Sequence, residues 1–96
     1  MFLGSYHFGG DTTELVVAYD RLLANFSLDE IEIHICVRRP DGLEVLDACP
    51  SREVFRNFSG GPDFRAAIAS AGLPQPRITE IGEIHKSIAS MSVVGD

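Results

Sequence analysis

Residues 31–49 read IEIHICVRRPDGLEVLDAC, which is the pattern of a β-hairpin. From Ile31 to Arg38 apolar and polar residues alternate strictly, and the apolar set is β-branched, as is typical of a half-buried strand. Pro40-Asp41-Gly42 is a turn sequence, and we expect Leu43 to Cys49 to return as the second strand.

The residues before the hairpin predict a strand and a helix. Phe2 to Phe8 mixes aromatic and small residues and ends at Gly9-Gly10, which indicates a first strand closed by a turn. Asp11 and Glu14 have the spacing of a capping box, which predicts the start of a helix. One face of that helix carries the apolar residues Leu15, Tyr19, Leu22, Leu23 and Phe26.

The residues after the hairpin predict two helical segments and a last strand. Ser51 is an N-cap, residues 59–61 break the helix, and Pro62 suits the first turn of a new helix that Gly72 ends. We expect the last strand over Pro76 to Ile88, with a bulge near Gly82 because its isoleucines do not share one parity. We expect residues 89–96 to form a loose tail.

This order of elements is that of a ferredoxin-like α+β fold. It predicts one domain over residues 1–96, with a four-stranded antiparallel sheet in the order 4-1-3-2. Right-handed crossovers place the helices on one face of the sheet and leave the other face uncovered.

Composition bounds the function. The chain has 96 residues, of which 45% are hydrophobic and 23% charged, so it fits a single small globular domain. A net charge of −6 argues against nucleic acid or an anionic membrane as partner. No apolar stretch is long enough to span a bilayer, and the start lacks the basic and apolar regions of a signal peptide. Two cysteines do not suggest a disulfide framework, so we expect a cytoplasmic protein.

The uncovered sheet face predicts a partner. We expect the isoleucines of residues 31–38 to face the helices, and the other parity to lie on the open face: Glu32, His34, Cys36 and Arg38. Because both parities of residues 43–48 are partly apolar, some apolar area remains on the open side. An exposed apolar patch on a small protein is typical of an interface, and the simplest closure is a homodimer.

The segment that follows the turn carries a resemblance. Residues 42–55 read GLEVLDACPSREVF and are followed by Phe58, Pro62 and Phe64. This pattern resembles the dimeric α+β barrel superfamily, in particular the antibiotic-biosynthesis-monooxygenase-like group and its uncharacterised actinobacterial relatives. Ile84-His85 is similar to a valine–histidine pair in the last strand of those relatives. The resemblance implies a homodimer whose two sheets enclose a small, largely apolar cavity. Some members oxidise polycyclic aromatic substrates without a cofactor, and others bind haem.

The chain departs from that pattern at two positions. Cys49 stands where the monooxygenases have tryptophan, and Phe58 stands where many members have histidine. Under the resemblance, Asp47 and Cys49 face the cavity. The two departures favour binding over oxygenase chemistry.

His34 and Asp47 are the candidate catalytic pair. In a hairpin with a four-residue loop over residues 39–42, His34 lies opposite Asp47, and the carboxylate could orient the imidazole as a general base. A structural hydrogen bond is the alternative role of the pair. In a hairpin with a three-residue loop, Arg38 instead lies opposite Glu44 and His34 opposite Ala48.

We assign the remaining chemistry-bearing residues to the cavity wall. The candidate ligand-binding residues are His7, Cys36, Cys49 and His85. We expect no metal site, because His7 and His85 fall at opposite ends of the sheet and no zinc-binding spacing is present. We also expect no disulfide between Cys36 and Cys49, which are offset along the hairpin by more than such a bond spans.

Two functions stay open at this point. The first is a homodimeric binding protein for a small apolar or aromatic metabolite, without cofactor. The second is a cofactor-independent monooxygenase or isomerase that acts on an aromatic or polyketide-like metabolite, with His34 as general base. In both, we expect the cavity on the open sheet face, with His34 and Asp47 on its wall and Ile33 and Ile35 pointing into the helix layer.

Overall fold

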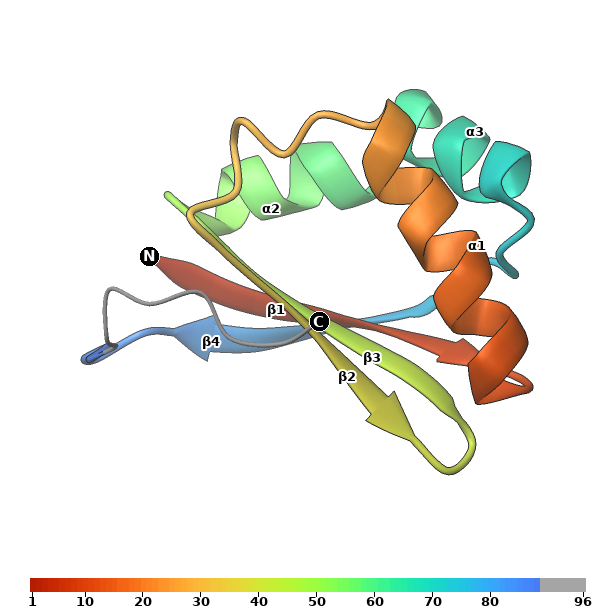
Figure 1. Ribbon diagram of the computed structural model, residues 1–96. Helices are drawn as coiled ribbons and strands as arrows, with labels where there is room; N and C mark the ends of the chain where they lie inside the picture. The colour runs from red at the N-terminus through yellow and green to blue at the C-terminus, as the bar shows by residue number, and fades with distance from the viewer. Residues whose placement is uncertain (89–96) are drawn as a thin grey trace.

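The computed structural model describes residues 1–88 and is a two-layer α+β structure, with a sheet below and helices above (Figure 1). The expected loose tail, residues 89–96, lies outside the described residues. The elements are, in chain order, β1 (Phe2–Gly9), α1 (Thr12–Asn25), β2 (Ile33–Arg39), β3 (Gly42–Cys49), α2 (Arg52–Ser59), α3 (Pro62–Ala71) and β4 (Arg77–Glu83).

The four strands form one antiparallel sheet in the order β2-β3-β1-β4. Read from the β4 edge, the same neighbours run β4-β1-β3-β2. The register between β1 and β4 shifts between Leu3 and Gly4, which pair with Gly82 and Glu80, so the expected bulge near Gly82 is confirmed. The last strand is shorter than predicted. Beyond the end of β4, the Ile84 N–H donates a hydrogen bond to the Met1 carbonyl.

The helix ends follow the local sequence. Asp11 accepts a hydrogen bond from the Glu14 N–H, and Ser51 accepts one from the Val54 N–H, so both predicted N-caps are confirmed. Gly72 ends α3 in the left-handed conformation with φ 86°, where glycine has no side chain to strain.

The core lies between the helices and one sheet face. Phe2, Tyr6 and Phe8 of β1 point into it, together with residues of β3 and all three helices. Helix α2 packs directly on β1, since a Cβ atom added at Gly4 would lie 2.0 Å from the Phe55 ring. Glycine at this position therefore allows the close approach of α2 to the sheet.

The prediction of which parity of β2 faces the helices is wrong. His34 lies under the helices, whereas Ile35 and Val37 are 50% and 40% exposed on the open face. The reason lies in β1, whose aromatic residues must be buried. Because Gly4 of that buried parity pairs with Asp47, and Asp47 pairs with His34, the register carries both side chains to the helix face.

Candidate functional site

The hairpin register brings His34 and Asp47 together. His34 pairs with Asp47 across β2 and β3, and only Pro40 and Asp41 separate the paired residues Arg39 and Gly42. The His34 Nδ1 atom lies 2.5 Å from Asp47 Oδ1. The predicted opposition of the two residues is confirmed, and the alternative register is not formed. The predicted location on the open face is wrong.

Tyr19 of α1 extends this pair into a chain of three groups. Its Oη atom lies 2.5 Å from His34 Nε2, and the phenol and imidazole rings are stacked with an interplanar angle of 3°. An ionised carboxylate can only accept hydrogen bonds, so Nδ1 donates to Asp47, and Nε2 accepts from the Tyr19 hydroxyl. We assign the tautomer from these partners.

Burial sets the protonation of Tyr19. Its pKa is raised above the ordinary value, first by burial and then by the nearby Cys36 and Asp47 side chains, whose ionised forms disfavour a phenolate. The Tyr19 hydroxyl therefore stays protonated at neutral pH and remains a hydrogen-bond donor.

Tyr6 of β1 places a second phenol near Asp47, on the helix side of the sheet. The residue is 2% exposed, and among the described residues its hydroxyl makes no hydrogen bond of regular geometry, although the Asp47 carboxylate lies close enough to interact with it. Burial, followed by the charge of Asp47, raises the pKa of Tyr6 well above its usual range, so this hydroxyl is also a donor. A buried hydroxyl without a partner costs about 1–3 kcal/mol.

These four polar groups line one small cavity between the helices and the sheet. Its volume is about 20 Å³, enough for a single water molecule. Apart from Tyr6, Tyr19, His34 and Asp47, its walls are apolar: Phe8, Leu22, Leu23, Phe26, Leu28, Val45, Phe58, Phe64 and Ile68. A few polar groups among apolar walls are typical of a small-molecule site. We call this space the inner cavity.

A larger groove lies outside it. It has a volume of about 430 Å³, and its walls come from the loop between α1 and β2 and from the junction of α2 and α3. Phe26, Phe58 and Phe64 line both this outer groove and the inner cavity. Their rings pack together: the distance between ring centroids is 5.5 Å for Phe26 and Phe58 and 5.3 Å for Phe58 and Phe64.

The predicted ligand-binding residues do not gather at one site. Cys36 lies half-buried against the core and Cys49 is buried at the end of β3. Both are free thiols whose pKa is raised, first by burial. His85 is exposed beyond β4, at the opposite end of the sheet from His7.

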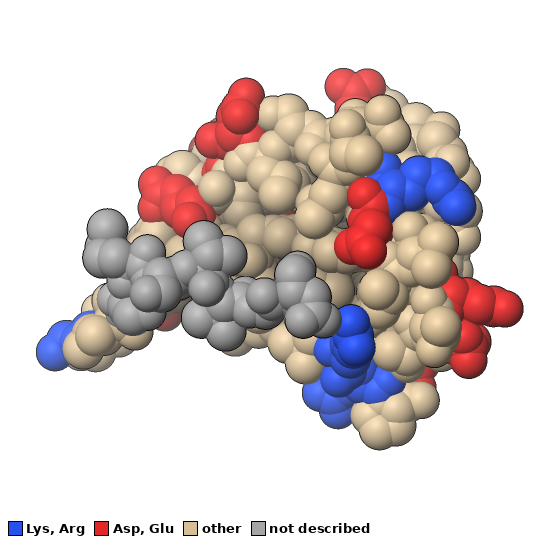
Figure 2. Space-filling view, in the orientation of Figure 1, with Lys and Arg blue, Asp and Glu red and all other residues tan. Residues whose placement is uncertain are grey.

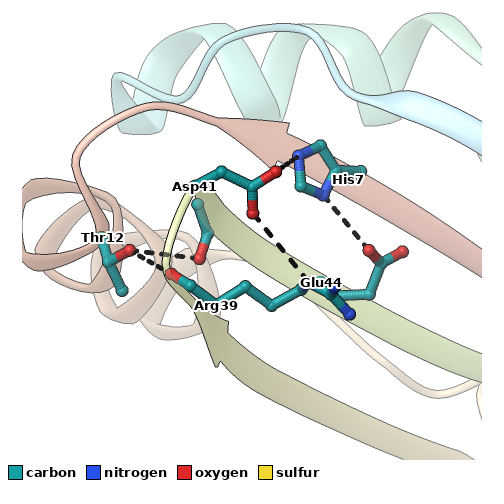
Figure 3. A network of polar contacts seen from close by, with 6 residues as sticks. His7, Thr12, Arg39, Asp41 and Glu44 are labelled. Carbon is teal, nitrogen blue, oxygen red and sulfur yellow. Dashed lines mark hydrogen bonds and ion pairs between the residues drawn. The ribbon is translucent and has the colours of Figure 1, made fainter.

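His7 lies on the open face in a polar network of its own. Its ring contacts Glu44 at 3.2 Å and Asp41 at 3.6 Å, while Thr12 donates to the carbonyls of Arg39 and Gly42 beside it (Figure 3). These contacts tie the start of α1 and the end of β1 to the turn of the hairpin.

The open sheet face carries an apolar surface that we call the open-face patch. Its residues share the parity that points away from the helices, and they are Leu3, Ile33, Ile35, Val37 and Leu46. More of the apolar residues lie here than the sequence predicted, because the isoleucines of β2 are on this side.

Within residues 1–88, no group of three or more histidine, cysteine or acidic side chains could hold a metal ion. None of the helices in the same range is long and apolar enough to cross a membrane. No family model matches the chain, and no curated protein or solved structure is similar enough to count as a match.

Sequence reasoning missed the roles of the two tyrosines. The sequence pattern places Tyr19 on an apolar helix face and Tyr6 among the aromatic residues of the first strand, and it assigns no role to either hydroxyl. A tyrosine in such a position carries a hydroxyl that needs a partner when buried, and this was the available signal.

Proposed function

We propose that the protein binds a small, mainly apolar molecule between its helices and its sheet, and that it does so as a homodimer. The buried Tyr6 hydroxyl, which makes no hydrogen bond of regular geometry although Asp47 lies beside it, carries the binding proposal. A ligand with an acceptor oxygen would satisfy this donor, and the apolar walls of the inner cavity would hold the rest of the molecule.

The chemistry of the inner cavity limits the ligand's buried end. Tyr6 is a donor at neutral pH, so the ligand presents a carbonyl, ether or similar acceptor to it. A carboxylate is disfavoured there because Asp47 lies next to Tyr6 and is 2% exposed. Since the cavity holds one water, binding requires the rings of Phe26, Phe58 and Phe64 to move outward into the groove that they also line.

Acetophenone and cumene test this proposal, because they have nearly the same shape and only acetophenone has an acceptor oxygen. By calorimetric titration, we expect the unaltered protein to bind acetophenone about tenfold more tightly than cumene, which is the effect of one buried hydrogen bond. The Tyr6→Phe variant should bind the two equally. Equal affinities in the unaltered protein would refute the role of Tyr6.

The homodimer is supported by the open-face patch, in which Ile35 is 50% exposed. Four strands of this length make a face of about 19 Å by about 25 Å. A flat face of that size has an area of about 475 Å², which is more than half of the roughly 800 Å² that each partner buries in a standard interface. Two copies packed sheet to sheet about a twofold axis also agree with the resemblance to the dimeric α+β barrel superfamily.

Sedimentation of matched variants tests the homodimer. We expect twice the chain mass at micromolar concentration, and a monomer for Ile35→Lys, which places a charge in the interface. Val17→Lys is the control, because Val17 is 57% exposed on α1, away from the sheet. A monomeric unaltered protein, or equal effects of the two variants, would contradict the proposed interface.

A second candidate function is acid–base catalysis, and the aligned Tyr19, His34 and Asp47 groups favour it. Because His34 Nε2 is bonded to Tyr19, His34 would act as base through the Tyr19 hydroxyl, in a cofactor-independent isomerase or monooxygenase. Exchange of the acetophenone methyl protons in deuterated water, followed by nuclear magnetic resonance, separates the functions. An enzyme accelerates exchange and loses this in His34→Gln, whereas a binding protein leaves the rate unchanged.

A further inference from the structure

We infer that the ligand carries a single aromatic ring, and that the Phe58 ring occupies the position which the ligand ring takes on binding. This inference rests on the proposed binding function, and it names the class of ligand and the movement that admits it. The Phe58 side chain turns outward into the outer groove, and the ligand ring replaces it between the helices.

The Phe58 ring packs against two other aromatic rings that line the inner cavity. Its centroid lies 5.5 Å from that of Phe26 and 5.3 Å from that of Phe64, with interplanar angles of 60° and 53°. Aromatic pairs favour tilted contacts at such distances, and these contacts contribute stability beyond the burial of apolar area. An aromatic ring of the ligand makes the same two contacts in this position, and a saturated ring does not.

Phe58 is the ring that can leave without opening the rest of the core. Among the residues of α2, it alone lines the inner cavity, whereas α1 and α3 each contribute more than one side chain. Phe64 is 6% exposed and packs on Tyr6, with ring centroids 5.1 Å apart. Phe26 continues the wall to which Leu22 of α1 also belongs. Phe64 and Phe26 therefore remain as walls and shift only enough to close on the ligand ring.

The outer groove gives the Phe58 ring a place to go. Phe58 is half-buried and lines this groove, whose volume is about 430 Å³. Ser59 Oγ donates a hydrogen bond to the Phe55 carbonyl, which holds the last turn of α2. Rotation of the Phe58 side chain between staggered positions therefore moves the ring while the helix stays in place. In Figure 2, uncharged surface extends over the helix layer between separate red and blue side chains, so no continuous layer of charge opposes the ring on this side.

The small volume of the inner cavity fits the part of the ligand next to the ring. About 20 Å³ accommodates a group of the size of one water molecule, such as a carbonyl oxygen, and no ring. Phe58 and Tyr6 both line this cavity, so a carbonyl attached to a ring at the Phe58 position can enter it and accept from the Tyr6 hydroxyl. A ring in place of Phe58 and an oxygen in the inner cavity together describe an aromatic ketone.

Truncation of Phe58 tests the replacement. If a side chain fills the site and is turned outward in only about one molecule in ten, the apparent affinity for the ligand is lowered about tenfold. By calorimetric titration of the full chain, we therefore expect acetophenone to bind Phe58→Ala about tenfold more tightly than the unaltered protein. Phe26→Ala is the matched control, because it removes an equal ring from the wall, and it should weaken binding about fivefold. If circular dichroism shows that Phe58→Ala is unfolded, Phe58→Leu takes its place and should also bind more tightly.

Two measurements on the unaltered protein complete the test. Cyclohexyl methyl ketone carries the carbonyl of acetophenone on a saturated ring, and we expect it to bind about fivefold more weakly. Nuclear Overhauser effects between the ring protons of Phe58 and those of Phe26 and Phe64 report the position of the Phe58 ring. We expect these effects to disappear when acetophenone saturates the protein, and those between Phe64 and Tyr6 to persist.

The outcomes separate this inference from the proposed function. If acetophenone binds the unaltered protein but binds Phe58→Ala no more tightly, or if the ring contacts of Phe58 persist at saturation, the inference is overturned while the binding function stands. Equal affinities for the two ketones would likewise overturn the aromatic class of ligand. If acetophenone binds neither protein, both proposals are overturned. The same holds if it binds Phe58→Ala alone, because the Phe58 ring is then a fixed part of the core.

Discussion

Replacement of Tyr6 by phenylalanine should make the protein more stable. Tyr6 is 2% exposed, and its buried hydroxyl makes no hydrogen bond of regular geometry among the described residues, although Asp47 lies nearby. The change removes this hydroxyl and leaves the shape of the ring unchanged. A buried polar group without a partner costs about 1–3 kcal/mol, so we expect the free energy of unfolding to rise by at least about 1 kcal/mol. In a chain of 96 residues this raises the melting temperature by about 4–8 °C for each kcal/mol.

Tyr19→Phe is the matched control, because the Tyr19 hydroxyl donates to His34 Nε2 at 2.5 Å. Its loss leaves a part-buried acceptor without this donor, so this variant should be less stable by about 1 kcal/mol. Urea unfolding followed by circular dichroism measures both variants. If Tyr6→Phe is as unstable as Tyr19→Phe, the Tyr6 hydroxyl has a partner in solution, and the argument for an unfilled binding position fails.

Three further predictions concern the residues around the site. Gly4→Ala should destabilise the fold by about 1–3 kcal/mol, because its Cβ would lie 2.0 Å from the Phe55 ring; an unchanged urea midpoint would contradict the close packing of α2 on β1. Asp47→Asn should lower the free energy of unfolding by about 1–3 kcal/mol through the weakened bond to His34 Nδ1, and an unaltered midpoint would mean that the pair is not formed in solution. The rate at which iodoacetamide alkylates Cys36 should reach half its maximum at a pH above the pKa of an ordinary cysteine, because burial raises the pKa of this thiol and the reactive thiolate forms only at higher pH. A half-maximal rate below about pH 8.5 would refute this.

Much of the fold could be predicted because it depends on local chemistry. The caps at Asp11 and Ser51, the left-handed Gly72 and the bulge near Gly82 are each determined by residues a few positions apart. The pairing of His34 with Asp47 is also local, because a short turn fixes the register of a hairpin.

The face of the hairpin could not be predicted from the hairpin alone. Strict alternation indicates that one side of β2 is buried, and the β-branched residues favour the isoleucine side as the buried one. Pairing with β1, which lies about 30 residues before His34 in the sequence, determines which face of the hairpin is buried. Gly4 of β1 pairs with Asp47, and the aromatic residues on the same face of β1 are buried under the helices. That long-range register moved His34 from the open face to the helix side, and with it the candidate site.

The central claim is that a ligand binds between the helices and the sheet, and the residues whose amide chemical shifts change on ligand addition test it most directly. Amide chemical shifts of the isotope-labelled protein can be followed while acetophenone is added. We predict that the largest shifts occur at Tyr6, Tyr19 and Phe58, which line the inner cavity, and that Ile35 on the open face stays unchanged. Shifts centred on Ile35, or no shifts at all, would contradict a binding site between the helices and the sheet.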